Sequence, residues 1–290
     1  MAEAPDSHSY YRLAADFAAL VRHGKTLPLG GLPPAARPAI PAQAPKALFF
    51  APHPDDETIA GGLALRLLWE AQWNIINVAV TQGSKAARKA ERWAELKNAC
   101  DFLGFGLRQT APGGLDGVNP KARADSPAAW AENVKVIAGI LAESQPRAIF
   151  FPHEHDWNGT HIGVHFLVMD ALRQLPDLSC YLVETEFWGQ MATPNLLVEY
   201  TAAEVGDLLA ATSFHVGEVQ RNPYHITLPA WMVDNVRRGA ELVGGQGGAS
   251  PDFLYGQLFR LQRWQAGKIQ AVQQGGRFLP ASTRADTLFA

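Results

Sequence analysis

ALFFAPHPDDET, residues 47–58, is the stretch that decides the fold. Its opening segment, 47–51, is an uncharged apolar run, which is typical of a strand buried in a parallel sheet. His53 follows between two prolines, and Asp55 and Asp56 come next, so an imidazole and two adjacent carboxylates occupy one tight turn. The stretch therefore predicts a buried strand whose carboxyl end carries chemically active side chains.

Outward from this turn, apolar runs alternate with helical patterns. The apolar runs predict strands, and the stretches between them, with apolar residues at helical spacing, predict helices. Because strands that alternate with helices pair in parallel through right-handed crossovers, we expect an α/β fold, a Rossmann-like three-layer sandwich with a mostly parallel sheet. Ligands of such sheets bind at the carboxyl ends of the strands. The predicted strands are 47–51, 74–80, 147–152 and 180–187, and the predicted helices are 58–70, 89–103, 128–143 and 160–175.

Two segments flank this alternating region. At the N-terminus, the spacing of Leu13, Phe17 and Leu20 indicates an amphipathic helix lying on the main body. Residues 27–46 contain six prolines, which favour an extended tether over a helix or a central strand. The predicted division is an N-terminal helix and Pro-rich arm at 1–46, a Rossmann-like core at 47–199, and a C-terminal cap of the same domain at 200–290 with helices at 202–214 and 229–243.

Composition excludes several classes of protein. The 290 residues are 47% hydrophobic and 18% charged, which is typical of a packed globular chain. Lys and Arg number 25 against 28 Asp and Glu, so no basic surplus favours nucleic-acid binding. No apolar run approaches the length of a membrane span, and the N-terminus lacks the pattern of a signal peptide. Two cysteines, Cys100 and Cys180, cannot build a disulfide framework, and we expect a reducing, cytoplasmic location.

A second polar segment, HEHDWNGTHIGVH at 153–165, directly follows the predicted strand 147–152. Adjacent carboxylates repel each other in a small buried site, and a divalent cation resolves that conflict. Imidazole nitrogen and carboxylate oxygen are ligands that suit zinc, and the second segment supplies further histidines at the same sheet edge. Taken alone, the Asp55–Asp56 pair is equally well explained as a helix N-cap. The two segments together favour a metal site.

The strand-His-Pro-Asp-Asp-Glu-helix pattern resembles the signature of the PIG-L/LmbE-like zinc deacetylases, which include N-acetylglucosaminyl-phosphatidylinositol de-N-acetylase. The resemblance covers about 47–187 and implies that His53, Asp56 and His161 bind zinc while Asp55 acts as general base. It implies a hydrolase that removes an N-acetyl group from a GlcNAc-type sugar or glycoconjugate, and it makes a homo-oligomer an expected state. Iron or manganese are alternatives to zinc.

The sequence departs from this family at one point. The common family pattern is His-x-Asp-His, but Asn158 stands three residues before His161, and an amide can donate a hydrogen bond without carrying a charge. His155 and His215 are then equal candidates for the catalytic histidine that helps stabilise the oxyanion.

Substrate-binding candidates are weaker. Arg92 could hold a hydroxyl or anionic group, Asp116 in a Leu-Asp-Gly turn could bind sugar hydroxyls, and Asn158 and Arg237 complete the set. For Arg92 a solvated or salt-bridged position is the more ordinary explanation, for Asp116 a turn former is an equally good one, and Arg237 could instead contact a second subunit. Three functions remain open: sugar N-deacetylation, zinc-dependent hydrolysis of a non-sugar amide or ester, and metal or sugar binding without turnover. A dinucleotide-dependent oxidoreductase is excluded, because a Gly-rich turn does not follow the first strand.

Overall fold

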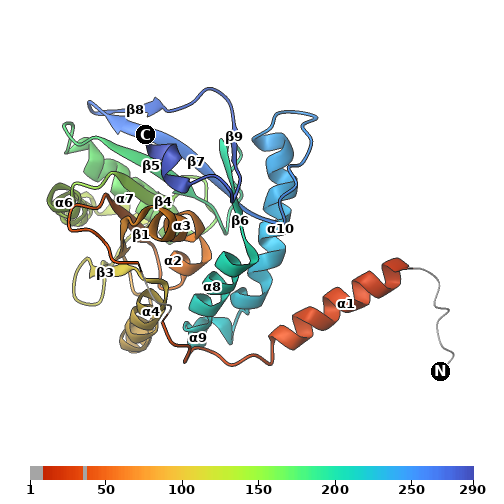
Figure 1. Ribbon diagram of the computed structural model, residues 1–290. Coiled ribbons are helices and arrows are strands. Elements are labelled where there is room, and N and C mark those ends of the chain that lie inside the picture. Colours follow the sequence, from red (N-terminus) through yellow and green to blue (C-terminus); the bar gives the residue numbers. More distant parts are fainter. Residues whose placement is uncertain (1–8, 35–37) are drawn as a thin grey trace.

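The computed structural model describes residues 9–34 and 38–290, and its centre is a nine-stranded sheet (Figure 1). The strand order is β3-β2-β1-β4-β5-β7-β6-β9, with β8 paired to β7. All pairs from β3 to β5 are parallel, whereas β7 runs antiparallel to β5, β6 and β8. The predicted α/β class with a mostly parallel sheet is confirmed. The strands are β1 (Lys46–Ala51), β2 (Asn74–Ala79), β3 (Gly106–Gln109), β4 (Ala148–Pro152), β5 (Cys180–Thr185), β6 (Leu196–Tyr200), β7 (Tyr255–Gln265), β8 (Lys268–Ala271) and β9 (Arg277–Leu279).

Helices cover both faces of the sheet, because successive residues of the buried strands point to opposite sides. Phe49 of β1 packs into the cluster formed with α3, α4 and α8, whereas Leu48 and Phe50 pack into the cluster formed with α6 and α7. Three layers result. The helices are α1 (Ser9–Gly24), α2 (Asp56–Ile59), α3 (Gly62–Ala71), α4 (Lys89–Leu103), α5 (Pro120–Asp125), α6 (Pro127–Ser144), α7 (Gly159–Arg173), α8 (Ala202–Ser213), α9 (Val216–Val219) and α10 (Tyr224–Leu242).

The predicted helix 58–70 is interrupted in the structure. It consists of α2 and α3, with the break between them at Ala60 and Gly61. Gly62 donates its backbone N–H to Gln257 Oε1 over 3.2 Å, and a Cβ on Gly62 would lie 2.6 Å from that oxygen. Because Gly62 has no side chain, the start of α3 can approach β7 more closely than it could with any larger residue at this position.

The C-terminal region contributes more than the predicted helices. The predicted helices 202–214 and 229–243 correspond to α8 and to most of α10, although α10 starts earlier, at Tyr224, and each helix ends one residue before the predicted end. The same region also supplies β7, β8 and β9, which were not predicted, and β7 is inserted between β5 and β6. Residues 200–290 therefore complete the central sheet in addition to flanking it.

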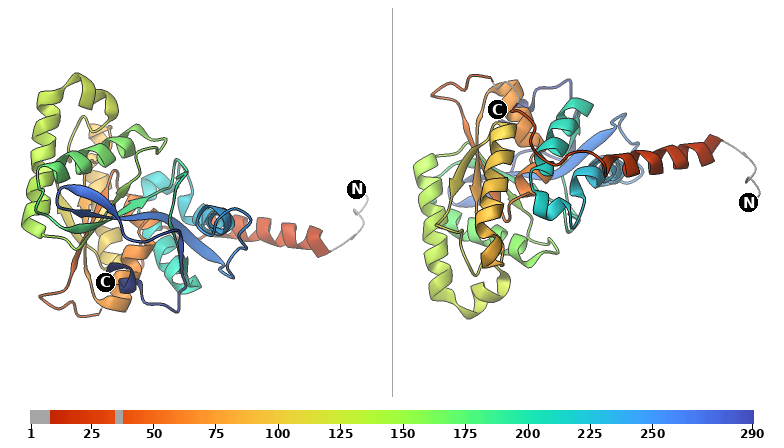
Figure 2. Two further views of the ribbon diagram at one scale, coloured as in Figure 1. Left: turned by 90° about the horizontal axis from the view of Figure 1, so that it is seen from above. Right: turned by 90° about the horizontal axis from the view of Figure 1, so that it is seen from below.

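The N-terminal helix forms as predicted, but it does not lie on the main body. Helix α1 projects away from the sheet and its helices (Figure 2), and Leu13, Phe17 and Leu20 are 65%, 56% and 66% exposed. Only its last residue, Gly24, is buried, against Ile226 of α10. The expected packing was wrong because the helix meets the body only at its C-terminal end. Of the predicted N-terminal segment, residues 1–8 and 35–37 lie outside the described residues.

Two further predictions concern membranes and disulfides. Within 9–34 and 38–290, no helix is both long and apolar enough to cross a bilayer. Cys100 lies in α4 and Cys180 in β5, both buried, and no disulfide joins them.

Arg66, on α3, joins distant parts of the chain and is fully buried. Its Nε donates to Glu70 Oε1 over 2.6 Å, and its guanidinium also donates to the carbonyls of Glu199 and Thr283. Replacing Arg66 with methionine keeps the aliphatic stem but leaves these buried acceptors unpaired, so we expect the free energy of unfolding to fall by about 3–5 kcal/mol. Urea denaturation measures this change. The exposed pair Lys97–Asp101 provides the control: Lys97→Ala should cost less than about 1 kcal/mol, and equal effects of the two substitutions would contradict the prediction.

Candidate metal centre

The turn after β1 is held in a fixed conformation by its own polar groups. Thr81, which follows β2, donates its hydroxyl to the carbonyl of Pro52 over 2.7 Å. Asp56, the first residue of α2, accepts the backbone N–H of His53 at Oδ2 over 2.8 Å. Because β1 pairs in parallel with β4, the loop after β4 reaches the same sheet edge, and this loop leads into α7 and His161.

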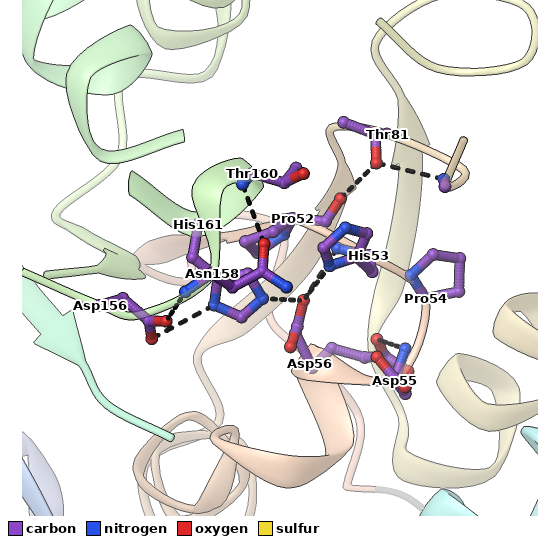
Figure 3. Close-up of polar contacts among 12 residues, drawn as sticks. Pro52, His53, Pro54, Asp55, Asp56, Thr81, Asp156, Asn158, Thr160 and His161 are labelled. Carbon is purple, nitrogen blue, oxygen red and sulfur yellow. Dashed lines mark hydrogen bonds and ion pairs between the residues drawn. The ribbon is translucent and has the colours of Figure 1, made fainter. Parts of the chain in front are cut away.

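His53, Asp56 and His161 converge there, each offering one ligand atom, and these atoms lie within 4.8 Å of one another. Asp56 Oδ2 is 3.5 Å from His53 Nδ1 and 3.3 Å from His161 Nε2, so the carboxylate stands between the two rings (Figure 3). The structure thus brings together the three residues predicted to bind metal, from two segments that are more than a hundred positions apart.

The chemistry of this cluster fits a divalent cation. His161 Nε2 is buried, yet it has no hydrogen-bond partner among the described residues. Two imidazoles and one carboxylate are a ligand set found in catalytic zinc sites, which keep a further position for water or substrate. Although burial opposes it, the charges of Asp56 and Asp156 raise the pKa of His161 to about 10. Negative charge around this imidazole is therefore in excess, as expected where a cation binds.

Asp156 lies on the other side of the His161 ring, as Figure 3 shows. Its Oδ2 is 3.4 Å from His161 Nδ1, and its Oδ1 accepts the backbone N–H of Asn158 over 2.8 Å. A carboxylate at this position fixes the tautomer and orientation of a ligating imidazole, leaving Nε2 to face the cation.

Loss of this carboxylate should weaken metal binding. We expect Asp156→Asn to lower zinc affinity by roughly 10–100-fold, because the amide supports the ligating tautomer of His161 less well. Competition against a chromogenic chelator measures the dissociation constant. Asp116→Asn, in an exposed turn, is the matched control and should bind zinc as the wild type does; an unchanged affinity in Asp156→Asn would show that Asp156 has no orienting role.

Asp55 occupies the strained position of the turn. Its φ of 120° lies in a region that L-residues rarely adopt. Its backbone N–H donates to Glu57 Oε2 over 3.0 Å, and the other Glu57 oxygen is 2.7 Å from Nε2 of the fully buried His215. Burial, with the charge of Asp56 second, raises the pKa of Asp55 well above its ordinary value. Asp55 is the N-cap residue of α2, but its side chain makes no capping hydrogen bond, so the capping explanation does not account for it.

A pocket of about 220 Å³ opens over this turn. Its residues come from the turn after β1, the segment from β2 to the start of α4, the loops after β4 and β5, and the segment from α9 to α10. The lining residues are His53, Asp55, Gln82, Gly83, Ser84, Lys85, Arg88, Arg92, Asn158, Trp188, Glu218, Arg221 and Tyr224.

Two of the predicted substrate-binding residues line this pocket. Arg92 donates to the carbonyl of Pro54 over 3.0 Å and thereby braces the turn that carries Asp55. Asn158 is the N-cap of α7, where its Oδ1 accepts the backbone N–H of Thr160 over 2.9 Å. The remaining polar atom of its side chain, Nδ2, is a donor only.

Three other predicted site residues lie elsewhere. His155 has a side chain that is 80% exposed, with Glu154 as its ion-pair partner at 3.7 Å. Asp116 accepts from Lys89 on the surface, over 3.0 Å. Arg237 pairs with Asp234 on α10 and lines a different, more open groove. The structure does not bring these three side chains to the metal cluster.

Two residues of the site were not predicted. Glu57 links Asp55 to His215, a residue 158 positions away, and Asp156 contacts Nδ1 of His161. The signal for Glu57 was its place directly after two other acids at a buried strand end, where a third carboxylate needs a partner. Asp156 stands in the same polar loop as His161, and its role could have been inferred from the rule that ligating histidines have a second hydrogen-bond partner.

The sheet and the cluster define the class: an α/β protein with a candidate His-Asp-His metal site at the carboxyl edge of its strands. Residues 48–172 match the family model of PIG-L, GlcNAc-PI de-N-acetylase. This match confirms the resemblance inferred from the motif, and with it the predicted class of enzyme, a hydrolytic de-N-acetylase. No curated protein sequence matches the chain.

Solved structures give the same fold. A conserved protein from Thermus thermophilus is 22% identical with a TM-score of 0.55, over 74% of this chain and 94% of that one. N,N'-diacetylchitobiose deacetylase from Pyrococcus horikoshii is 16% identical with a TM-score of 0.52, over 89% and 94%. The 4-carboxy-2-hydroxymuconate hydratase GalB from Pseudomonas putida is 15% identical with a TM-score of 0.52, over 75% and 95%. Since a hydratase and a deacetylase share the fold, the site must decide the reaction.

Proposed function

We propose that this protein is a metal-dependent N-deacetylase that hydrolyses the N-acetyl amide of a GlcNAc-type sugar or glycoconjugate to a free amine and acetate. The observation that carries the proposal is the Asp55 carboxyl, which lines the same pocket as His53, a member of the His53–Asp56–His161 cluster. A carboxylate beside a metal centre is the arrangement required for general-base hydrolysis of an amide. The family match and the chitobiose deacetylase support the same reaction.

His53, Asp56 and His161 would hold the cation, for which zinc is the first candidate. When bound, such a cation lowers the pKa of a water ligand and polarises the amide carbonyl. Asp55 accepts a proton from the attacking water and returns it to the departing amine nitrogen. A raised pKa suits both steps, because it makes Asp55 a stronger base and a usable acid.

The residues around Asp55 divide the supporting roles. His215 is a positioning residue that acts through Glu57, since Glu57 holds the backbone N–H of Asp55. Asn158 lines the pocket with an amide donor, which can hydrogen-bond the oxygen of the reacting carbonyl. His155 is exposed and is the weaker of the two candidate histidines.

A substrate panel with metal-loaded protein tests the proposal. Amine release is measured on N-acetylglucosamine derivatives, on non-sugar acetamides and on acetate esters. Turnover of acetylated sugars that stops after chelation and returns with zinc supports the proposal. Turnover confined to non-sugar amides or esters contradicts the sugar assignment, and metal binding without any turnover contradicts the enzymatic one.

Three properties stay predictions. Zinc is preferred over iron and manganese because a given set of nitrogen and oxygen ligands binds zinc more tightly than either. A cytoplasmic location rests on the cysteine content of the sequence. A homo-oligomeric state rests on resemblance to the family.

A further inference from the structure

The pocket is more basic than deacetylation requires. Four of its lining residues are cationic, namely Lys85, Arg88, Arg92 and Arg221, and its lining carboxylates are Asp55 and Glu218. The cations come from the segment after β2 and the segment after α9, whereas His53 and Asp55 come from the turn after β1. An N-acetyl group is neutral, so its recognition does not account for four cationic side chains in the pocket.

One carboxylate, that of Glu218, does not neutralise the four cationic side chains. It lies 3.0 Å from Arg88 and 3.8 Å from Arg92, and it also pairs with Arg221. Against the effect of burial, these three guanidinium groups lower the pKa of Glu218, the sign expected where cations outnumber one carboxylate. Glu91 adds a second, exposed carboxylate 3.6 Å from Arg88. Lys85 has no carboxylate at ion-pair distance in the part of the chain that the structure describes.

The cations differ in how far they are committed to the fold. Arg92 is nearly buried and braces Pro54, so it has a structural duty. Arg221 follows α9 with its side chain 65% exposed, and Lys85 is exposed in the loop before α4. Guanidinium groups bind carboxylate and phosphate oxygens through paired hydrogen bonds, and lysine adds a point charge. The exposed side chains of Lys85 and Arg221 can therefore turn towards a ligand without disturbing the core.

We propose that Lys85, Arg88 and Arg221 form an anion subsite for a carboxylate or phosphate group of the substrate, so the substrate class is an acidic N-acetylated amino sugar. This inference rests on the proposed function, because it assumes that the acetyl group lies over His53 and Asp55. The same cavity is lined by both sets of residues, so one small molecule can contact them together.

Binding of three probes tests the subsite directly. The probes are N-acetylglucosamine, N-acetylglucosamine 6-phosphate and N-acetylmuramic acid, which present no charge, a phosphate and a carboxylate. Calorimetry on the zinc-loaded protein should give at least about tenfold tighter binding for one charged probe than for the neutral one. The charged probe that binds tighter identifies the anion, and the difference should shrink as ionic strength rises.

Variants then assign the residues. Lys85→Gln and Arg221→Gln alter exposed side chains, and each should narrow the gap between charged and neutral probes to a few-fold. Lys121→Gln, on the exposed surface of α5, is the matched control and should keep the full gap. Equal binding of all three probes, no binding of any, or a gap that survives both pocket substitutions would overturn the subsite.

The same titrations separate this inference from the proposed function. Amine release is followed in parallel on all three probes. If amine is released but charged and neutral probes bind equally, the subsite is refuted and the deacetylase assignment stands. Tight binding of a charged probe that depends on Arg221, without release from any probe, supports the subsite and counts against deacetylation.

Discussion

Asp55→Asn is expected to reduce amine release by roughly 10²–10⁴-fold while the protein keeps its metal, because asparagine cannot accept the proton of the attacking water. Asparagine is close to aspartate in size and makes the same backbone hydrogen bond to Glu57. The turn should therefore retain its shape. Initial rates on the acetylated sugar that turns over fastest measure the loss.

Metal analysis of the same samples separates chemistry from folding. Asp55→Asn should contain as much zinc as the wild type, since Asp55 is outside the ligand cluster. Asp125→Asn, at the exposed end of α5, controls for the loss of a surface carboxylate and should retain full activity. Activity within tenfold of wild type in Asp55→Asn would exclude Asp55 as the general base.

His161→Ala is expected to abolish stoichiometric zinc binding and, with it, activity. Removal of one of three protein ligands leaves His53 and Asp56, which come from a single turn and cannot enclose a cation from both sides. Metal content after dialysis should fall from about one equivalent to near zero. Elemental analysis measures it.

His155→Ala is the matched control for this experiment. His155 lies in the same loop, but its side chain is exposed, so its removal should leave the zinc content unchanged. Equal retention of zinc in both variants would refute the assignment of His161 as a ligand. Loss of zinc in both would mean that the loop, and not one imidazole, holds the metal.

Local sequence predicts the parts of the fold in which neighbours in the chain are also neighbours in space. Helix α4 was predicted with its observed ends, because Gly104 adopts the left-handed conformation that closes it. Strand β7 was missed. Polar residues such as Gln257 and Arg260 interrupt its apolar run, and its partners, β5 and β6, are remote in sequence. Such pairing depends on the whole fold, and local propensity says little about it.

The site shows the same division. His53, Asp56 and His161 were assigned from sequence through the family motif. Their two segments each follow a recognisable strand, and because parallel strands end at one edge, the segments were expected to lie together. The contact between Glu57 and His215 depends on how α8 and α9 pack beside α2, which no local pattern encodes. The exposed position of His155 was equally hidden, since the side chain of a histidine three residues after a strand end can point either into the site or into solvent.

The backbone of Asp55 places stability and chemistry in opposition at a single position. With φ at 120°, this residue has a conformation in which glycine would be relaxed and aspartate is strained by about 1–3 kcal/mol. A redesign guided by stability alone would thus favour glycine here, and the more stable protein would lack the proposed base. Position 55 consequently offers a criterion for inspecting homologous sequences: a chain with glycine there would lack the proposed base and gain backbone stability.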